Sequence, residues 1–314
     1  MAKQKLTEIE LKLKNHTPPE LNHAFHKTVS YSQFSIYAKC PHQWYLTYVE
    51  NKQPYQATIH TVFGTAIHET IQEYVDNMYV LSGAAADRMN LHEIFQNKFS
   101  ELYTEEYKKV GSHFSIPTEM GEFYEDAVNL LNYVKKNRKK IFTTKGVKLL
   151  DIELPLLIKV SNNIFLKGFI DVVFYDVDTN KVQIWDFKTS KSSWSDEQKK
   201  DEIKQYQLLL YKHYFSKQYD FPIENIEVKF VILKRKIWEK SEYPQPRVQN
   251  VVPPSGTNKM NKCLTVFNDF IKNSFDEFGK PQIKSYIKNV GESSCKWCPY
   301  RDDITLCDKK NVLS

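Results

Sequence analysis

The spacing of apolar side chains divides the chain into segments with two different periods. A recurrence every three to four residues, typical of amphipathic helices, runs through 30–49, 62–81, 90–110, 117–140, 196–217 and 258–278. An alternation of apolar and polar positions, typical of strands, begins at Val147 and continues through 165–175, 181–188 and 226–233, with an edge hairpin that reaches Val252. This order of segments predicts an α/β fold, in which a mixed sheet is flanked by helices.

Polar and proline-rich stretches suggest how the chain is divided. Residues 1–29 are polar, contain Thr17-Pro18-Pro19, and are expected to form an N-terminal arm. Residues 30–314 are expected to form a single domain, with a helical insertion over 69–145, a sheet and its main helix over 146–252, and a cysteine-rich cap over 290–310. The Cys40-Pro41 step should break or bend the first helix, because proline disfavours helix in the residue before it.

Composition and charge restrict the class of protein. A chain of 314 residues with 41% hydrophobic and 14% aromatic residues can bury a substantial core. The net charge of +6 is modest, but basic residues are concentrated in 135–140 and 234–236. Each run is either an ordinary solvated helix face or strand end, or a contact for phosphates, with aromatic residues stacking on bases.

The sequence also predicts the compartment. No stretch approaches the roughly 20 apolar residues of a membrane span, and the N-terminus lacks the apolar core of a signal peptide. We therefore expect a cytoplasmic protein with no membrane partner. In that reducing environment the five cysteines are expected to be thiols or ligands and not disulfides.

The main chemical signal lies in the hairpin GFIDVVFYDVDTNKVQIWDFK, residues 168–188. Side chains alternate across a strand, so Asp186 and Lys188 share one face. If the turn centres near Asp178 and Thr179, paired residues have numbers that add up to 357, and Asp171 lies opposite Asp186. A slip of one residue would move Asp171 to the other face. Two facing aspartates repel, and a divalent cation would remove that cost, as in metal-assisted phosphodiester hydrolysis.

Four residues outside the hairpin are also candidates for the site. His68, at the edge of the apolar stripe of helix 62–81, is either a hydrogen-bonded, half-buried histidine or a ligand. Glu153 alternates with Ile152, Leu154 and Leu156 and is either a solvent-facing acid or a residue near a metal. Gln207 and Tyr211 lie one turn apart on the apolar face of helix 196–217. A buried glutamine needs a polar partner, because leaving it unpaired costs about 1–3 kcal/mol.

The cysteines form a further constellation. Cys295, Cys298 and Cys307 have the spacing C-x2-C-x8-C, and three thiolates leave a tetrahedral or cubane site one ligand short. Cys40, which is also followed by a proline, is the obvious fourth ligand. Zinc and an iron–sulfur cluster are both compatible with this set. Cys263, inside helix 258–278, is expected to be a small buried residue.

Together, these motifs resemble those of the PD-(D/E)XK nuclease superfamily. GFID at 168–171 followed by DFK at 186–188 is similar to its active-site signature. GTAIH at 64–68, QLLLY at 207–211, and SYS followed by CP at 40–41 are similar to motifs of RecB-type members. One cysteine before the core and three after it resembles the arrangement in AddB-type and CRISPR-associated RecB-like exonucleases.

The resemblance implies a metal-dependent DNA nuclease, in particular an exonuclease that acts on DNA ends or single strands in recombination, repair or phage DNA metabolism. Mg²⁺ or Mn²⁺ would be bound by His68, Asp171, Asp186 and the carbonyl of Phe187, with Glu153 as a secondary candidate. Lys188 would orient and help to deprotonate the attacking water, and Gln207 and Tyr211 would position the strand. A 4Fe–4S cluster, or alternatively zinc, would be held by Cys40, Cys295, Cys298 and Cys307.

Two partners and one rival function follow. DNA is the expected substrate, and a helicase or recombination partner would be another chain, because the sequence contains no GxxxxGK[ST] phosphate loop. The rival is a non-catalytic DNA-end-binding or structural subunit of a larger assembly. The intact set of two aspartates, lysine, glutamine and tyrosine argues against it, because a binding protein has no need of facing carboxylates.

Overall fold

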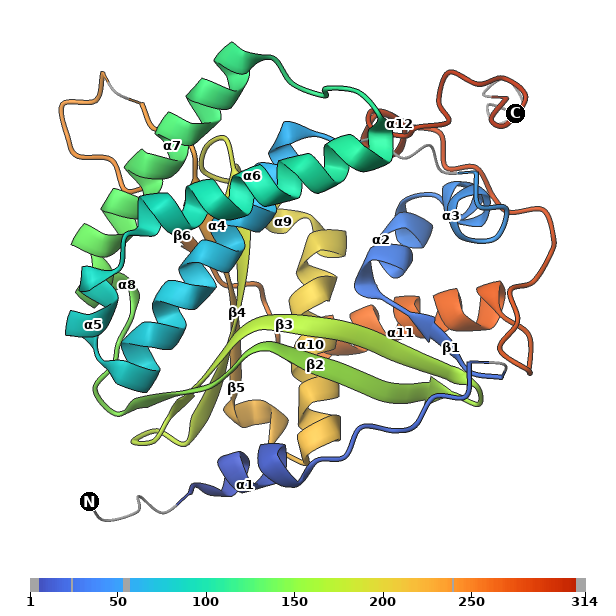
Figure 1. Cartoon of the computed structure of the whole chain (residues 1–314). Helices are drawn as coiled ribbons and strands as arrows, with labels where there is room; N and C mark the ends of the chain where they lie inside the picture. The colour runs from blue at the N-terminus through green and yellow to red at the C-terminus, as the bar shows by residue number, and fades with distance from the viewer. Residues whose placement is uncertain (1–5, 24, 53–56, 239, 309–314) are drawn as a thin grey trace.

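A six-stranded mixed sheet forms the centre of the computed structural model (Figure 1), which describes residues 6–23, 25–52, 57–238 and 240–308. The strands are β1 (Lys27–Val29), β2 (Val147–Ser161), β3 (Ile164–Asp176), β4 (Lys181–Ser190), β5 (Ile226–Lys234) and β6 (Val248–Val251). Their order is β1-β3-β4-β5-β6, with β2 also paired to β3. β1 runs parallel to β3 and β5 runs parallel to β4, whereas the other pairs are antiparallel. The predicted α/β fold with a mixed sheet is confirmed.

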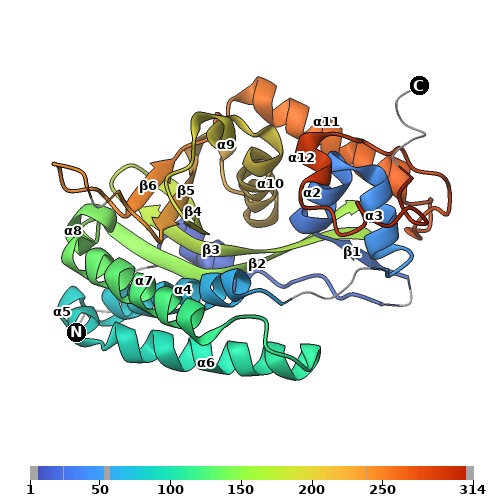
Figure 2. The ribbon, with the colours of Figure 1, turned by 90° about the horizontal axis from the view of Figure 1, so that it is seen from above.

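Helices cover both faces of the sheet (Figure 2). One face is covered by α4 (Ile59–Asp76) and α7 (Pro117–Lys136), and α6 (Leu91–Val110) packs on the outer side of these two helices (Figure 2). The other face packs against α10 (Glu202–Tyr219), and α11 (Thr257–Ser274) lies behind it with α2 (Tyr31–Lys39) and α3 (Pro41–Tyr48). The shorter helices are α1 (Glu8–Asn15), α5 (Gly83–Arg88), α8 (Arg138–Ile141), α9 (Asp196–Lys200) and α12 (Glu292–Cys295), with a π-helix at Asn77–Leu81 and a 3₁₀ turn at Ile223–Asn225.

Side-chain caps and proline set several helix boundaries. The hydroxyl of Ser30 accepts the N–H of Gln33 and starts α2, and the helix breaks at the predicted Cys40-Pro41 step. The predicted helix over 196–217 is instead two helices. Asp201 separates them, because its carboxylate accepts the N–H groups of Ile203 and Lys204 and begins α10.

Within residues 6–23 and 25–29, two segments pack against the rest of the protein. Ile9 of α1 is buried in the core beneath α10, and Lys148 of β2 forms an ion pair with Glu10 at 2.8 Å. β1 joins the sheet beside the first residues of β3. None of the helices in the described part of the chain combines the length and the apolar character that crossing a bilayer requires.

One edge of β3 is shared by two strands and leaves a gap. β2 pairs with β3 along its length, so β1, at Ile164–Leu166, and β4, at Val172–Asp176, both use the opposite edge. Val172 lies opposite Trp185, which is the register with numbers adding up to 357 predicted from the sequence. The β3–β4 ladder stops at this pair, and Asp171 is the next residue of β3, at the border of the gap.

The β2–β3 ribbon changes faces at Glu153. The φ of Glu153 is +53°, a left-handed conformation that costs a non-glycine residue on the order of 1–3 kcal/mol. Ile152 packs on the core beneath α4, whereas Leu154 and Leu156 pack in the core beneath α10. The predicted alternation of these three residues on one face is therefore wrong, because the backbone twists between Ile152 and Leu154.

Candidate active site

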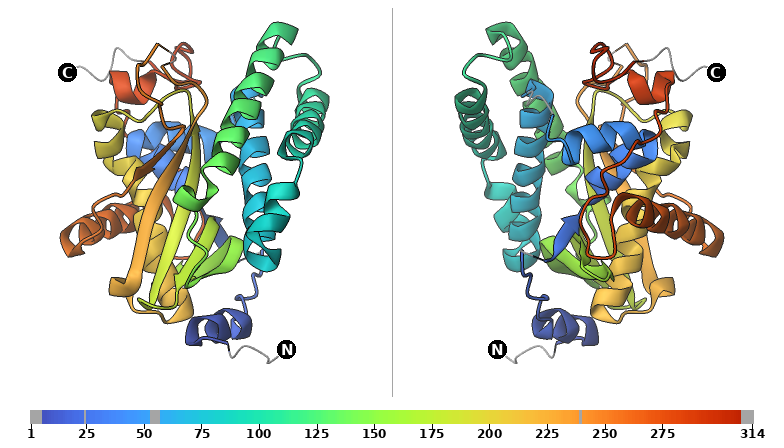
Figure 3. Two further views of the ribbon diagram at one scale, coloured as in Figure 1. Left: turned by 90° about the vertical axis from the view of Figure 1, so that its left-hand side faces the viewer. Right: turned by 90° about the vertical axis from the view of Figure 1, so that its right-hand side faces the viewer.

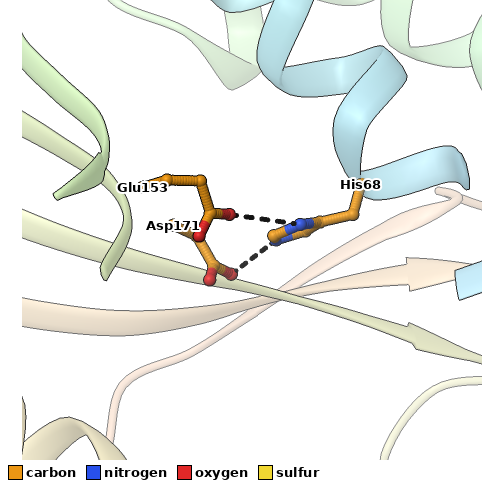
Figure 4. A group of neighbouring side chains, drawn as sticks. All are labelled: His68, Glu153 and Asp171. Carbon is orange, nitrogen blue, oxygen red and sulfur yellow. Dashed lines mark ion pairs between the residues drawn. The ribbon is translucent and has the colours of Figure 1, made fainter. Parts of the chain in front are cut away.

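Three potential metal ligands meet where α4 faces β2 and β3 (Figure 4). Nε2 of His68 lies 2.7 Å from Oδ2 of Asp171, and Nδ1 of His68 lies 3.7 Å from Oε1 of Glu153. One ligand atom from each residue falls within 4.8 Å of the others. Metal–ligand distances of about 2.0–2.6 Å place the ligands of one ion about 3–5 Å apart. The three side chains could therefore hold a single cation, and Glu153, the secondary candidate, is one of them.

Gln72 supports two of these residues from one turn further along α4. Its amide donates to Oε1 of Glu153 at 2.5 Å and to the backbone carbonyl of Asp171 at 3.2 Å, and its side chain is buried. Sequence reasoning did not identify Gln72. The available signal was its position four residues after His68, which places both on one face of the helix.

Asp171 also closes the open end of the β3–β4 ladder. Its Oδ2 accepts the backbone N–H of Phe187 at 2.6 Å, so the side chain replaces the carbonyl that the ladder would otherwise supply. The carboxylate is thereby held on the side of His68. The ring of Phe187 lies 5.8 Å from the imidazole of His68 in an edge-on arrangement and is part of the core beneath α4. For Phe187, the structure shows a role for the N–H, and a role for its carbonyl at a metal stays a prediction.

Asp186 lies fully buried beside this group. Its Oδ1 accepts the amide of Gln207 at 2.7 Å, and its Oδ2 lies 2.7 Å from Nζ of Lys188. Within the described structure Oδ2 forms this ion pair but has no hydrogen bond of good geometry. The buried glutamine thus has the polar partner that its position on an apolar face required.

Burial and charge shift the pKa values of this group. Burial raises the pKa of Asp186 to about 7, with Asp171 contributing in the same direction and Lys188 opposing it. Burial disfavours the charged form of Lys188, but the carboxylates of Asp186 and Asp171 outweigh it and raise the lysine pKa above its usual value. Burial likewise opposes charge on His68, and its hydrogen bond to Asp171 reverses this and raises the imidazole pKa. Three carboxylates against one lysine favour a further positive charge at this place.

Tyr211 and Gly168 complete the wall next to Gln207. The Tyr211 hydroxyl lies 3.4 Å from Nε2 of Gln207. A Cβ added at Gly168 would lie 3.2 Å from the tyrosine ring, so glycine in the GFID motif allows close approach of α10 to β3. Gln207, Tyr211, Lys167 and Phe169 line a groove of about 320 Å³ beside the site. Every side chain predicted for the nuclease site therefore lies in one neighbourhood.

The cysteine-rich end of the chain packs against the helix that follows Cys40. His42 contacts the carbonyl of Leu306 at 2.8 Å through Nε2, and Asn289 donates to the carbonyl of Lys39 at 3.1 Å. The right-hand view of Figure 3 shows this C-terminal segment beside α2 and α3.

The other three predicted cluster ligands lie close enough to Cys298 to affect its pKa. The pKa of Cys298 is raised by burial and further by Cys40, Cys307 and Cys295. All four are partly exposed. Cys263 is fully buried in α11, as expected, and burial raises its pKa to about 12. The donor set and its gathering from both ends of the chain fit a shared metal centre.

The two basic runs have structural partners. Arg138 binds Asp87 through two hydrogen bonds of 3.0 and 2.9 Å. Arg235 and Lys236 both lie 2.9 Å from the buried carboxylate of Asp126 on α7. For these cations the alternative of phosphate contact is not supported, because their charges already join the end of β5 and α5 to the helical layer.

Comparison with known families agrees with this geometry. The model of the PD-(D/E)XK nuclease superfamily matches residues 28–303. No curated protein gives a significant match to the chain. The matched range begins in β1 and includes the hairpin, α4, α10 and the cysteines as far as Cys298. The chain therefore belongs to the PD-(D/E)XK nuclease superfamily.

Proposed function

We propose that this protein is a metal-dependent DNA nuclease that acts as an exonuclease on DNA ends or single strands. The observation that carries the proposal is the meeting of His68, Glu153 and Asp171 beside the Asp186–Lys188 pair. Members of this superfamily are usually nucleases, which supports cleavage of a phosphodiester over binding alone.

Mg²⁺ or Mn²⁺ fits the donors, because carboxylate oxygens suit hard cations and a neutral imidazole is tolerated by Mn²⁺. His68, Glu153 and Asp171 would hold the ion, with Asp186 beside them. Bound there, it would stabilise charge on the phosphate and lower the pKa of a bound water. Glu153 is oriented for this role by Gln72, and Asp171 by the N–H of Phe187.

Lys188 would position the attacking water. Its raised pKa keeps the ammonium charged, and Asp186 holds that ammonium at 2.7 Å. A fixed positive charge stabilises the negative charge that develops as the water loses its proton. Gln207 and Tyr211 line the adjoining groove, where they would contact the strand that is cut.

The second part of the proposal concerns the cysteines. We infer that Cys40, Cys295, Cys298 and Cys307 hold a 4Fe–4S cluster, with zinc as the alternative metal. The pairing of His42 with Leu306 supports this, because it brings the two cysteine-bearing segments together from opposite ends of the chain. Thiol ligands also suit the reducing interior expected of the cytoplasm. A helicase or recombination partner would be a separate chain that supplies the DNA end.

End-labelled DNA tests the activity. Single-stranded and duplex substrates, linear and circular, are incubated with Mg²⁺, Mn²⁺ or EDTA. We expect cleavage of linear DNA that stops with EDTA and with Lys188→Ala or Glu153→Gln. Asp151→Asn is the matched control, because Asp151 lies on β2 two residues before Glu153 and outside the ligand group.

The outcomes separate the two functions. Cleavage of circular substrates would show that the protein acts as an endonuclease and not as an exonuclease. Tight binding of DNA ends without cleavage in either metal would overturn the nuclease and favour the rival, a non-catalytic end-binding subunit.

A further inference from the structure

A second groove lies outside the site, between the start of α10 and the cysteine-rich segment. It has a volume of about 990 Å³. Its walls are the end of α2 at Lys39, the first turn of α10 with its cap Asp201, and residues 288–297. Figure 2 shows α12, which is part of the segment 288–297, near α2 and α10. Three segments far apart in the sequence thus form one surface.

The charge of this groove is strongly positive. Four lysines line it, against a single carboxylate, namely Lys39, Lys204, Lys288 and Lys296 against Asp201. Asp201 is already engaged, since it caps α10 and lies 3.4 Å from Nζ of Lys204. Among the described residues no acidic group pairs with the other three lysines, so their charges face solvent without compensation and favour a polyanion.

Trp297 adds an aromatic surface to these charges. Its side chain is 85% exposed, and Nζ of Lys296 lies 5.8 Å from the centre of its ring. A large exposed aromatic group in a basic groove provides what single-stranded nucleic acid requires, a face for base stacking beside cations for the backbone. In a duplex the base faces are already stacked on their neighbours and are not available to such a ring.

α10 connects this groove to the nuclease site. Ile203 lines the groove, and Gln207, four residues later on the same face, donates to Asp186. Four residues correspond to about 6 Å along a helix. Tyr31 lies between the two, because it lines the hollow at Gln207 and its hydroxyl donates to the carbonyl of Ile203 at 2.9 Å. A strand in the groove is therefore within a few nucleotides of the carboxylates.

We propose that this groove binds single-stranded DNA next to the nuclease site, with one base stacked on Trp297 and phosphates held by Lys288 and Lys296. The proposal rests on the proposed nuclease function and narrows its substrate class to single strands or frayed ends.

The test is binding of a fluorescein-labelled oligothymidylate to the full chain by anisotropy, in EDTA so that no cleavage occurs. Trp297→Ala should lower the affinity about five- to hundredfold, the range for loss of one stacked base. Lys288→Ala should reduce the slope of log affinity against log salt by about 0.7. A blunt duplex of the same length should bind weakly and be insensitive to Trp297→Ala.

Trp238→Ala is the matched control. Trp238 is 70% exposed and lines a hollow with Lys191, Lys234 and Lys236. Lys236 pairs with Glu122 and Asp126 at 3.0 and 2.9 Å, and Lys234 is buried and donates to Ser193. The Trp238→Ala variant should bind oligothymidylate with unchanged affinity. Because Trp297 lies between Cys295 and Cys298, thermal melting checks the fold of its variant. If that variant does not fold, Lys288→Ala alone decides.

The results separate this proposal from the nuclease assignment. Wild-type affinity in Trp297→Ala, or an unchanged salt slope in Lys288→Ala, would overturn the proposal that the groove binds single-stranded DNA, even if the protein cuts DNA. Weaker oligothymidylate binding in Trp297→Ala, together with the smaller salt slope in Lys288→Ala, would support binding in the groove even if no metal gives cleavage.

Discussion

The backbone N–H of Phe187 donates to Oδ2 of Asp171 at 2.6 Å, directly beyond the last pair of the β3–β4 ladder. One carboxylate therefore has two tasks. It holds two strands together where they separate, and it faces His68 as a potential ligand. A substitution that keeps the shape of the side chain but removes its charge can test the two tasks separately.

Asp171→Asn and Asp171→Ala should therefore differ in stability and agree in activity. Asparagine keeps an oxygen that can accept from Phe187, whereas alanine leaves this N–H without its partner, at a cost of about 1–3 kcal/mol. We expect urea unfolding to show that loss for alanine only, and Mn²⁺-dependent cleavage to be lost in both. Equal stabilities would show that the contact with Phe187 does not hold the strands.

Asp186 should make the metal-free protein less stable as the pH rises. Its pKa is raised from 3.8 to about 7 by burial, so between these values the folded state binds more protons than the unfolded state. Stability carried by this group is then present at low pH and lost as the pH rises toward 7. Asp186→Asn should remove this slope in urea unfolding with EDTA. The exposed Asp178→Asn serves as a control, and a slope retained in Asp186→Asn would contradict the assignment.

His68 and Gln72 should be separable by metal titration. His68→Ala removes a ligand atom at the surface of a helix, so we expect normal folding and loss of most activity. Gln72→Ala leaves the ligands in place but frees Glu153, and loss of such a supporting contact typically weakens metal affinity or activity about 10–100-fold. Excess Mn²⁺ should restore Gln72→Ala and not His68→Ala. A lowered melting temperature with unchanged activity in His68→Ala would instead identify a structural histidine.

The cysteine assignment predicts a colour. Protein purified without oxygen should be brown, with about four iron and four sulfide per chain. Cys40→Ala should bleach it as fully as Cys298→Ala, because each supplies one ligand to the same centre, while Cys263→Ala should keep the colour. A colourless protein with one bound zinc would favour the alternative, and a brown Cys40→Ala would exclude Cys40 from the centre.

The hairpin register could be predicted because a polar turn and alternating strands define it locally. Asp171 and Asp186 followed from that register, although the structure places Glu153 with His68 and Asp171 and pairs Asp186 with Lys188 and Gln207. The left-handed backbone conformation of Glu153 could not be predicted, because glycine is the residue that usually marks such a conformation and none stands at this position.

Contacts between segments that are distant in the sequence could not be predicted either. The amide of Gln72 meets Glu153 across 81 positions, and Arg138 meets Asp87 across 51. Periodicity says which face of an element is buried, but it does not say which polar groups will meet there. The break at Asp201 was hidden for a different reason, because the apolar spacing continues through it.

At Glu153, selection for stability and selection for activity should favour different residues. Glycine and asparagine adopt positive φ at lower cost, so either would relieve the chain at this position. Neither offers a carboxylate to the ion. A library of variants selected only for heat resistance should therefore drift away from glutamate here, whereas one selected for DNA cleavage should keep it. The most costly residue conformation of the strand would then be retained for chemistry and not for folding.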